Sequence, residues 1–280
     1  AVIAAGFLLF ALIGFLDDRL KVIKHENLGL RAWQKFGMQF LLAVLFAVYM
    51  AYFSDKGTSV FVPFVNEYYD FGIWYIPFII FTILSMVNAV NLTDGLDGLA
   101  AGVTAIVALC MAAVAVYIGA DSPGCFFAAL MGGCLGFLFY NRYPAKVFMG
   151  DVGSTTLGFI LIVIGIYFHN QTTIEIYYFL ILTSLFWFDA TLTILRRAIK
   201  REKLTTAHNK HLYQILIRSG YSHIHTLFLG LTINLALLII CILLNRDVIP
   251  IPGAFTAVVV LFLIYDRFVH YVYRGRQYDI

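Results

Sequence analysis

Long apolar runs, separated by short polar segments, follow one another along the whole chain. A transmembrane helix needs about 20 mostly apolar residues to cross a hydrocarbon core about 30 Å thick. We therefore predict an all-α, polytopic integral membrane protein that forms a single transmembrane domain over residues 1–280. Nine stretches approach the required length, at residues 1–16, 36–53, 71–92, 99–119, 124–140, 152–168, 175–195, 226–244 and 251–270.

The composition agrees with this pattern. The 280 residues are 61% hydrophobic and 12% charged, with a mean hydropathy of +0.87. A soluble domain averages about 45–50% apolar and about 25% charged residues. So few charges cannot solvate a globule of this size, which excludes a soluble enzyme, a disordered chain and a nucleic-acid-binding protein.

The basic residues mark one side of the predicted membrane domain. Of the 19 Lys and Arg, 17 follow odd-numbered stretches or lie near the end of the ninth, whereas Lys56 and Arg246 lie in the alternate segments. Positively charged segments stay on the cytoplasmic side of a membrane. This asymmetry predicts a visible N-terminus outside and a C-terminus in the cytoplasm.

Five aspartates gather at the same predicted face. Asp17 and Asp18 close the first stretch, Asp94 and Asp97 lie in a glycine-containing turn, and Asp151 opens the sixth stretch. A single charged residue at the end of a transmembrane helix often only extends its side chain into the aqueous interface. That explanation fits five carboxylates in three short segments less well. Such a group suits Mg²⁺, which binds one or two carboxylates and completes its coordination with water and substrate phosphates.

A magnesium site beside basic residues favours phosphoryl chemistry. The metal would neutralise charge on a diphosphate, while Lys21, Lys24, Lys35 and the basic loop 196–218 hold the remaining oxygens. The sequence contains no GxxxxGK[ST] motif, so a P-loop ATPase is not indicated. A transporter is also disfavoured, because its ionisable groups belong near the bilayer midplane and between inverted repeats.

The longest polar segment, residues 196–225, carries four histidines. One interpretation is an interfacial segment attracted to anionic headgroups. The other is a binding loop: His208 and His211 are three residues apart, so on a helix they would share a face and donate hydrogen bonds to a phosphate or sugar. Asp189, about two helical turns before Arg196 and Arg197, either acts at the site or pairs with a neighbour.

Three motifs resemble one known family. They read FLDDRLKV at residues 15–22, NAVNLTDGLDGLA at 88–100 and NRYPAKVFMGD at 141–151. In this order they resemble the polyprenyl-phosphate N-acetylhexosamine-1-phosphate transferases, and over residues 10–151 most of all the phospho-N-acetylmuramoyl-pentapeptide transferase branch. In that family further transmembrane helices precede the Asp-Asp motif, so the resemblance implies that N-terminal helices are missing from this chain.

The resemblance implies transfer of a phospho-sugar from a UDP-sugar to undecaprenyl phosphate, with release of UMP. It places the protein in the bacterial inner membrane as a multi-pass, Mg²⁺-dependent enzyme with a cytoplasmic active site. UDP-N-acetylmuramoyl-pentapeptide is the donor expected from the first branch, which would make the product lipid I of peptidoglycan synthesis. A homodimer is a further expectation of the family.

Roles for individual residues also follow from the resemblance. Asp151 is the expected magnesium ligand, Asp17 the group that activates the lipid phosphate as a base or a covalent nucleophile, and Asp18 a support for the site or the metal. Lys21 and Lys35 are expected near the phosphates. The nucleoside pocket, with Phe148 stacking on uracil, is expected to comprise Asn91, Asp94, Gly95, Leu96, Asp97, Asn141 and Phe148.

The last third of the sequence is similar to a different branch. The segment TAHNKHLYQ at residues 206–214 resembles enzymes that transfer N-acetylglucosamine-1-phosphate or a similar group in O-antigen or teichoic-acid synthesis. The resemblance makes residues 196–225 a cytoplasmic sugar-recognition loop containing His208 and His211. UDP-N-acetylglucosamine or a related UDP-N-acetylhexosamine is therefore the alternative donor.

Overall fold

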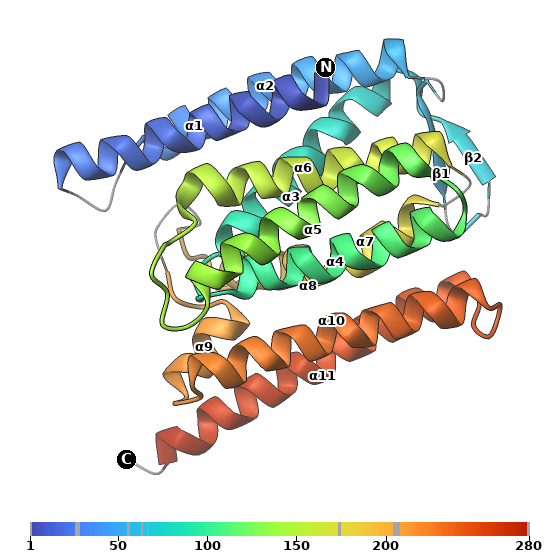
Figure 1. Ribbon diagram of the computed structural model, residues 1–280. Helices are drawn as coiled ribbons and strands as arrows, with labels where there is room; N and C mark the ends of the chain where they lie inside the picture. Colours follow the sequence, from blue (N-terminus) through green and yellow to red (C-terminus); the bar gives the residue numbers. More distant parts are fainter. Residues whose placement is uncertain are drawn as a thin grey trace.

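The computed structural model describes residues 2–25, 29–54, 57–62, 64–65, 67–172, 175–203 and 208–278. These residues form a helical bundle with one short β-hairpin (Figure 1). The helices are α1 (Val2–Lys24), α2 (Ala32–Phe53), α3 (Tyr75–Thr93), α4 (Leu99–Tyr117), α5 (Asp121–Asn141), α6 (Gly150–Gln171), α7 (Ile176–Leu182), α8 (Ser184–Ile199), α9 (Leu212–Arg218), α10 (His223–Asn245) and α11 (Ile251–Tyr278). The prediction of an all-α polytopic protein is confirmed.

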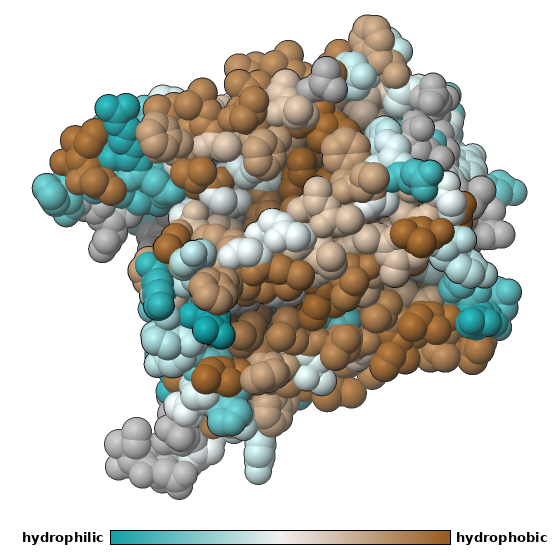
Figure 2. Space-filling view, in the orientation of Figure 1, coloured by the Kyte–Doolittle hydropathy of each residue, from teal (hydrophilic) through white to brown (hydrophobic). Residues whose placement is uncertain are grey.

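The number of spans differs slightly from the sequence prediction. Seven described helices are long and apolar enough to cross a membrane, or eight if the bent pair α7 and α8 counts as one span. Helix α1 is not among them, because any segment of α1 long enough to cross includes Asp17, Asp18 and Arg19. Figure 2 shows apolar side chains over the middle of the bundle and polar ones toward its two ends.

The predicted stretch at 175–195 corresponds to a bent pair of helices, α7 and α8, rather than to one straight helix. The chain bends by 67° between α7 and α8. The hydroxyls of Thr183 and Ser184 donate to the carbonyls of Phe179 and Ile181, and the amide of Asn234 from α10 donates to the carbonyl of Leu182. A broken helix is tolerated inside a membrane where such neighbours satisfy the freed backbone groups.

Close packing of α1 on α6 brings two distant parts of the sequence together. A Cβ atom on Gly14 would lie 2.3 Å from the backbone oxygen of Asp151, so only glycine permits this approach. The end of α1 therefore lies beside the first turn of α6. Helix α3 also packs on α6, and α4 packs along α5.

The two ends of the bundle differ. The α1–α2 turn, the α5–α6 connection, α9 and the C-terminus lie at one end, shown on the left of Figure 1. The other end carries the α10–α11 turn and an antiparallel hairpin of β1 (Ser59–Val62) and β2 (Glu67–Asp70), in which Ser59 pairs with Asp70. The hairpin is not predicted from the sequence pattern, and Lys56 lies outside the described residues.

Candidate active site

Three aspartates from the first and sixth predicted stretches meet at one point. Asp17 and Asp18 lie near the end of α1, and Asp151 lies in the first turn of α6. One carboxylate oxygen of each lies within 4.8 Å of the others. The α1–α6 contact at Gly14 is the structural cause, since it places the two helix ends side by side.

Asp18 lies at the N-terminus of α6. Its Oδ2 accepts a hydrogen bond of 3.0 Å from the backbone N–H of Val152. The first N–H groups of a helix lack partners within the helix, and its dipole favours a negative charge there. Gly150 has a φ of +64°, and a Cβ atom on it would lie 2.5 Å from Asp18 Oδ2. The glycine thus leaves room for the carboxylate.

Two lysines neutralise part of this charge. Lys21 Nζ lies 2.7 Å from Asp17 Oδ2, 3.2 Å from Asp18 Oδ1 and 2.6 Å from Asp151 Oδ2. Lys35 Nζ, from α2, lies 3.0 Å from the same oxygen of Asp151. The structure thus places both predicted lysines at the carboxylates. Lys24, also predicted near the phosphates, is exposed at the end of α1.

Asp17 is the most enclosed member of the group, with 3% of its surface exposed. Its Oδ1 accepts a hydrogen bond of 2.8 Å from the backbone N–H of Leu30. Burial, followed by the neighbouring Asp151 carboxylate, raises the pKa of Asp17. A carboxylate with a raised pKa is a better proton acceptor near neutral pH than an ordinary aspartate.

The donor atoms of this group fit a hard divalent cation. Asp17, Asp18 and Asp151 offer only oxygen ligands, which Mg²⁺ and Ca²⁺ prefer. The Lys21 ammonium lies within 3.2 Å of one oxygen from each, so a metal bound by all three and this ammonium would compete for one position. An acidic cluster able to hold a metal is therefore present.

A polar cavity of about 350 Å³ opens beside the aspartates. Asn91, from the end of α3, donates 2.5 Å to Asp151 Oδ1 and 2.7 Å to Ser154 Oγ. Phe148 is 76% exposed at its edge, where a flat ligand could stack on the ring. The lining comprises Asp18, Lys21, Asn91, Asp94, Gly95, Leu96, Asp97, Asn141, Phe148, Met149, Gly150 and Asp151.

Asp94 differs from the other carboxylates of the cavity. Burial, reinforced by the charges of Asp151, Asp18 and Asp97, raises the pKa of Asp94 to about 7. It is half-buried at the turn between α3 and α4. Near neutral pH this group can therefore act either as a hydrogen-bond donor or as a charged acceptor.

Three predicted binding residues shape the wall of the cavity. The Asn141 side chain accepts from the N–H of Gly98 at 3.0 Å and donates to the carbonyl of Val147 at 2.9 Å. Asp97 Oδ2 accepts from the N–H of Ala145 at 2.9 Å. The Leu96 side chain is almost fully buried. These contacts hold the 91–98 turn against the 142–149 segment.

His208 and His211 do not lie on one helix, although their ring centroids are 5.1 Å apart. His211 precedes the first turn of α9, and His208 lies before it in irregular structure. His211 is buried, with Nδ1 3.2 Å from Asp189 Oδ2, and the N–H of Leu212 donates to Asp189 Oδ1 at 3.0 Å. Asp189 therefore pairs with a neighbour, as one alternative expected, although that neighbour is His211 rather than an arginine.

Two side chains at the site were not among the sequence predictions. Tyr213 donates from its hydroxyl to the carbonyl of Leu92 at 2.9 Å, which ties α9 to the 91–98 turn. Ser154 accepts from Asn91. Its position three residues after Asp151 on a helix could have indicated a shared face. The sequence carries no comparable signal for Tyr213.

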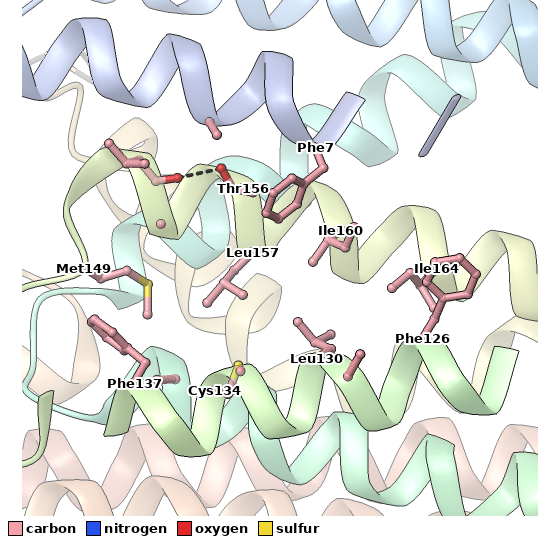
Figure 3. A pocket seen from close by; sticks show the side chains of 16 residues that line it. Phe7, Phe126, Leu130, Cys134, Phe137, Met149, Thr156, Leu157, Ile160 and Ile164 are labelled. Carbon is pink, nitrogen blue, oxygen red and sulfur yellow. Dashed lines mark hydrogen bonds between the residues drawn. The ribbon is translucent and has the colours of Figure 1, made fainter. Parts of the chain in front are cut away.

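A second, apolar cavity lies beside the polar one. It measures about 530 Å³ and is bounded by α1, α5 and α6. Figure 3 shows Phe7 of α1, Leu130 of α5 and Ile160 of α6 around it, with Met149 at one end. Met149 lines both cavities. The charged site therefore adjoins a surface suited to a hydrocarbon.

Comparisons with known proteins agree with this arrangement. Three phospho-N-acetylmuramoyl-pentapeptide-transferases match the chain: that of Heliobacterium modesticaldum is 46% identical over 157 residues (56% of this chain, 49% of the relative), that of Alkaliphilus oremlandii 53% over 160 residues (53% and 48%), and that of Clostridium botulinum strain Alaska E43 45% over 182 residues (59% and 55%). The chain spans about half the length of the curated relatives that it matches.

A family model also matches. The model of glycosyl transferase family 4 covers residues 1–169, which hold the three aspartates, the 91–98 turn and Phe148. The similarity of the last third to a second branch lies beyond this match and stays a prediction. Because the match extends over more than half of the 280 residues, the chain belongs to glycosyl transferase family 4.

Proposed function

We propose that this protein transfers a phospho-sugar from a UDP-sugar to a polyprenyl phosphate and releases UMP. The observation that carries the proposal is the meeting of Asp17, Asp18 and Asp151 with Lys21 and Lys35 at one end of a membrane bundle. The named relatives, at 45–53% identity over their matched parts, support the same reaction. The face carrying the site is proposed to be cytoplasmic, in the bacterial inner membrane, where nucleotide sugars are available.

The three aspartates would have different roles in the reaction. Asp17 takes the proton of the polyprenyl phosphate, and its raised pKa suits this role. The freed phosphate oxygen attacks the β-phosphorus of the UDP-sugar, and the bond from that phosphorus to UMP breaks. Asp151 and Asp18 would hold Mg²⁺, which when bound neutralises charge on the diphosphate. Lys21 and Lys35 would bind the phosphate oxygens that remain.

The polar cavity would hold the nucleoside. Phe148 offers an exposed ring for stacking on uracil, and Asn91 and Asp94 offer hydrogen-bonding groups. Asn141 and Asp97 would position the cavity wall through their backbone contacts. The apolar cavity that meets this site at Met149 offers a surface to an acceptor with a long hydrocarbon tail.

UDP-N-acetylmuramoyl-pentapeptide is the donor that we favour, and undecaprenyl phosphate the acceptor, which would make the product lipid I. The relatives named above support this choice through their printed names. UDP-N-acetylglucosamine remains the second candidate, because the segment around His208 and His211 resembles enzymes that use such donors. The buried His211–Asp189 pair would then act by positioning the loop rather than by touching the sugar.

The test is release of UMP by the purified protein with Mg²⁺, undecaprenyl phosphate and each donor in turn. We expect UMP with the muramoyl-pentapeptide donor and loss of this activity when the metal is chelated. UMP released only with UDP-N-acetylglucosamine would move the protein to the second branch. No UMP with any UDP-sugar, from protein shown to be folded by thermal unfolding, would overturn the proposal.

A further inference from the structure

A basic pocket of about 270 Å³ lies between α8, α9 and α11. Thr193, Arg196 and Arg197 of α8 line it, together with Lys200 directly after the helix, and these positions share one face because they are three or four residues apart. Arg218 of α9 and Tyr273 of α11 close the other sides. The faces of three helices therefore converge on one hollow.

The pocket carries an excess of positive charge. Arg196, Arg197, Lys200, Lys210 and Arg218 line it, with Glu202 as its acidic lining residue. Like charges so close together repel one another, so this arrangement is stabilised when an anion binds among them. The sequence predicts that the basic loop 196–218 holds the diphosphate, but the pocket shares no lining residue with the aspartate cavity.

The contacts within the pocket leave donors available. Glu202 forms ion pairs with Lys210 at 2.6 Å and with Arg197 at 3.3 Å. Arg196 forms an ion pair with Asp266 of α11. Arg218 makes long contacts, 3.4 Å to the hydroxyl of Tyr273 and 3.4 Å to the carbonyl of Asn209. Within the described part of the chain, Lys200 forms no ion pair and Nη1 of Arg196 makes no hydrogen bond.

Apolar side chains flank the same hollow. Ile194, Leu195 and Ile199 are exposed on the remaining face of α8, and Ile264 and Tyr271 are exposed on α11. Both helices belong to candidate membrane spans, so these exposed apolar side chains are suited to contact hydrocarbon. A basic pocket beside such faces suits a ligand that has both a charged headgroup and acyl chains.

We propose that this pocket binds the phosphate headgroup of an anionic phospholipid, with its acyl chains on the exposed apolar faces of α8 and α11. Arginine and lysine donors match phosphate oxygens, and the adjoining apolar faces supply the contact that a small soluble anion would not use. The proposal is independent of the transfer reaction, because it uses none of the aspartate-site residues. The bound lipid would also hold Lys210 and Asn209, and with them the segment that leads to His211.

The experiment measures lipid binding to the purified full chain by native mass spectrometry. The probes are phosphatidylglycerol and phosphatidylcholine of equal chain length. The pocket variant is Lys200→Gln/Lys210→Gln/Arg218→Gln. The matched control is Arg19→Gln/Lys24→Gln/Lys146→Gln, which removes three exposed positive charges from the same end of the bundle but outside the pocket. Thermal unfolding of each variant checks that it is folded.

We expect the wild type and the control to prefer phosphatidylglycerol, and the pocket variant to bind it about tenfold more weakly. Equal loss in both variants would overturn the proposal in favour of unspecific surface charge. No preference over phosphatidylcholine would also overturn it. Displacement of the lipid by millimolar inorganic phosphate would instead assign the pocket to a small soluble anion, and displacement by a UDP-sugar would return it to the transfer reaction.

Discussion

The aspartate cavity and the basic pocket lie at the same end of the bundle but have opposite charge. The first collects three carboxylates and meets them with Lys21 and Lys35. The second collects five cationic side chains and meets them mainly with Glu202 and Asp266. A net charge in a partly buried site calls for a ligand of the opposite sign. By this criterion the carboxylates of the first site suit a cation, and the cationic side chains of the second suit an anion.

The two sites also differ in how they are built. The aspartate cavity depends on two glycines that permit close backbone approach, and on short hydrogen bonds between helices remote in sequence. The basic pocket combines side chains of three helices with Glu202, Asn209 and Lys210 from the segment before α9, and its contacts range from 2.6 Å for Lys210 to Glu202 up to 3.4 Å at Arg218. Catalysis requires groups held within fractions of an ångström, whereas binding a headgroup tolerates adjustment.

The largest expected effect is the loss of transfer in Asp151→Asn. Removing a charge that is proposed to hold the metal and that contacts both lysines should lower turnover by roughly 10³-fold, since such electrostatic support supplies several kcal/mol. UMP release measures it. Asp121→Asn, an exposed aspartate in the first turn of α5, is the matched control. Retained activity in Asp151→Asn would contradict the proposed role of Asp151. A comparable loss in Lys200→Gln/Lys210→Gln, assayed in detergent, would contradict the separation of the basic pocket from the transfer reaction.

A smaller effect should distinguish the ammonium of Lys21 from a bound metal. In Lys21→Met the three carboxylates lose a cation that lies within 3.2 Å of each, so their affinity for Mn²⁺ should rise about tenfold or more. Turnover should fall, because the donor phosphates lose a partner. Paramagnetic resonance of free Mn²⁺ reports the binding, with Lys24→Met as the control. An unchanged or weaker affinity would show that the ammonium does not compete with the metal.

Gly14→Ala should weaken the aspartate site and lower the thermal stability of the protein, but leave the basic pocket intact. The added Cβ atom would lie 2.3 Å from the backbone of Asp151, and overpacking of this kind costs about 1–3 kcal/mol. The control is Gly132→Ala in α5, where a Cβ atom meets nothing within 4 Å. In Gly14→Ala the melting temperature and the affinity for Mn²⁺ should both decrease, while lipid binding by the basic pocket should persist. A loss of both ligands together would mean that the sites are not independent.

The smallest expected effect is a pH dependence caused by Asp94. Its pKa is about 7 in the folded chain against 3.8 as the ordinary value, so between these pH values the folded state holds a proton that the unfolded state has lost. The free energy of unfolding should therefore fall as pH rises from about 4 to 7, and this contribution should not change further above 7.

Metal-free protein in detergent allows the measurement. The melting temperature of the wild type should decrease by roughly a few degrees across this range, and the decrease should be shallower in Asp94→Asn. Asp247→Asn, an exposed aspartate at the other end of the bundle, should follow the wild type. Identical slopes in all three proteins would contradict the raised pKa.

Much of the site could be predicted from the order of its motifs. The predicted helix ends place Asp17, Asp94 and Asp151 on one face, because helices that cross a bilayer alternate in direction. The sequence could not predict that Asp94 and Asp97 only line the cavity while Asp17, Asp18 and Asp151 come together. That depends on which helices pack closely, and the contact at Gly14 involves residues more than 130 positions apart.

The local structure around His208 and His211 also depends on tertiary contacts, and their role in binding stays a prediction. A spacing of three residues indicates a shared face only if the segment is helical, and here α9 begins after His211. Asp189 contacts the His211 ring and accepts from the first N–H of α9, so a residue of α8 caps the start of this helix. The bend between α7 and α8 also depends on a tertiary contact, because Asn234 of α10 donates a hydrogen bond to the Leu182 carbonyl at the bend.

By itself, the sequence determined the membrane class, the helix count to within one or two, and the face on which the charges lie. Those properties follow from local hydropathy and charge, because the insertion of each segment into a bilayer depends mainly on its own length, hydropathy and flanking charges. Only the tertiary structure decided which carboxylates form a cluster, that Lys21 lies among them, and that the basic loop forms a pocket apart from the aspartates. Those properties follow from helix packing, where one glycine or one side chain determines how closely distant segments approach.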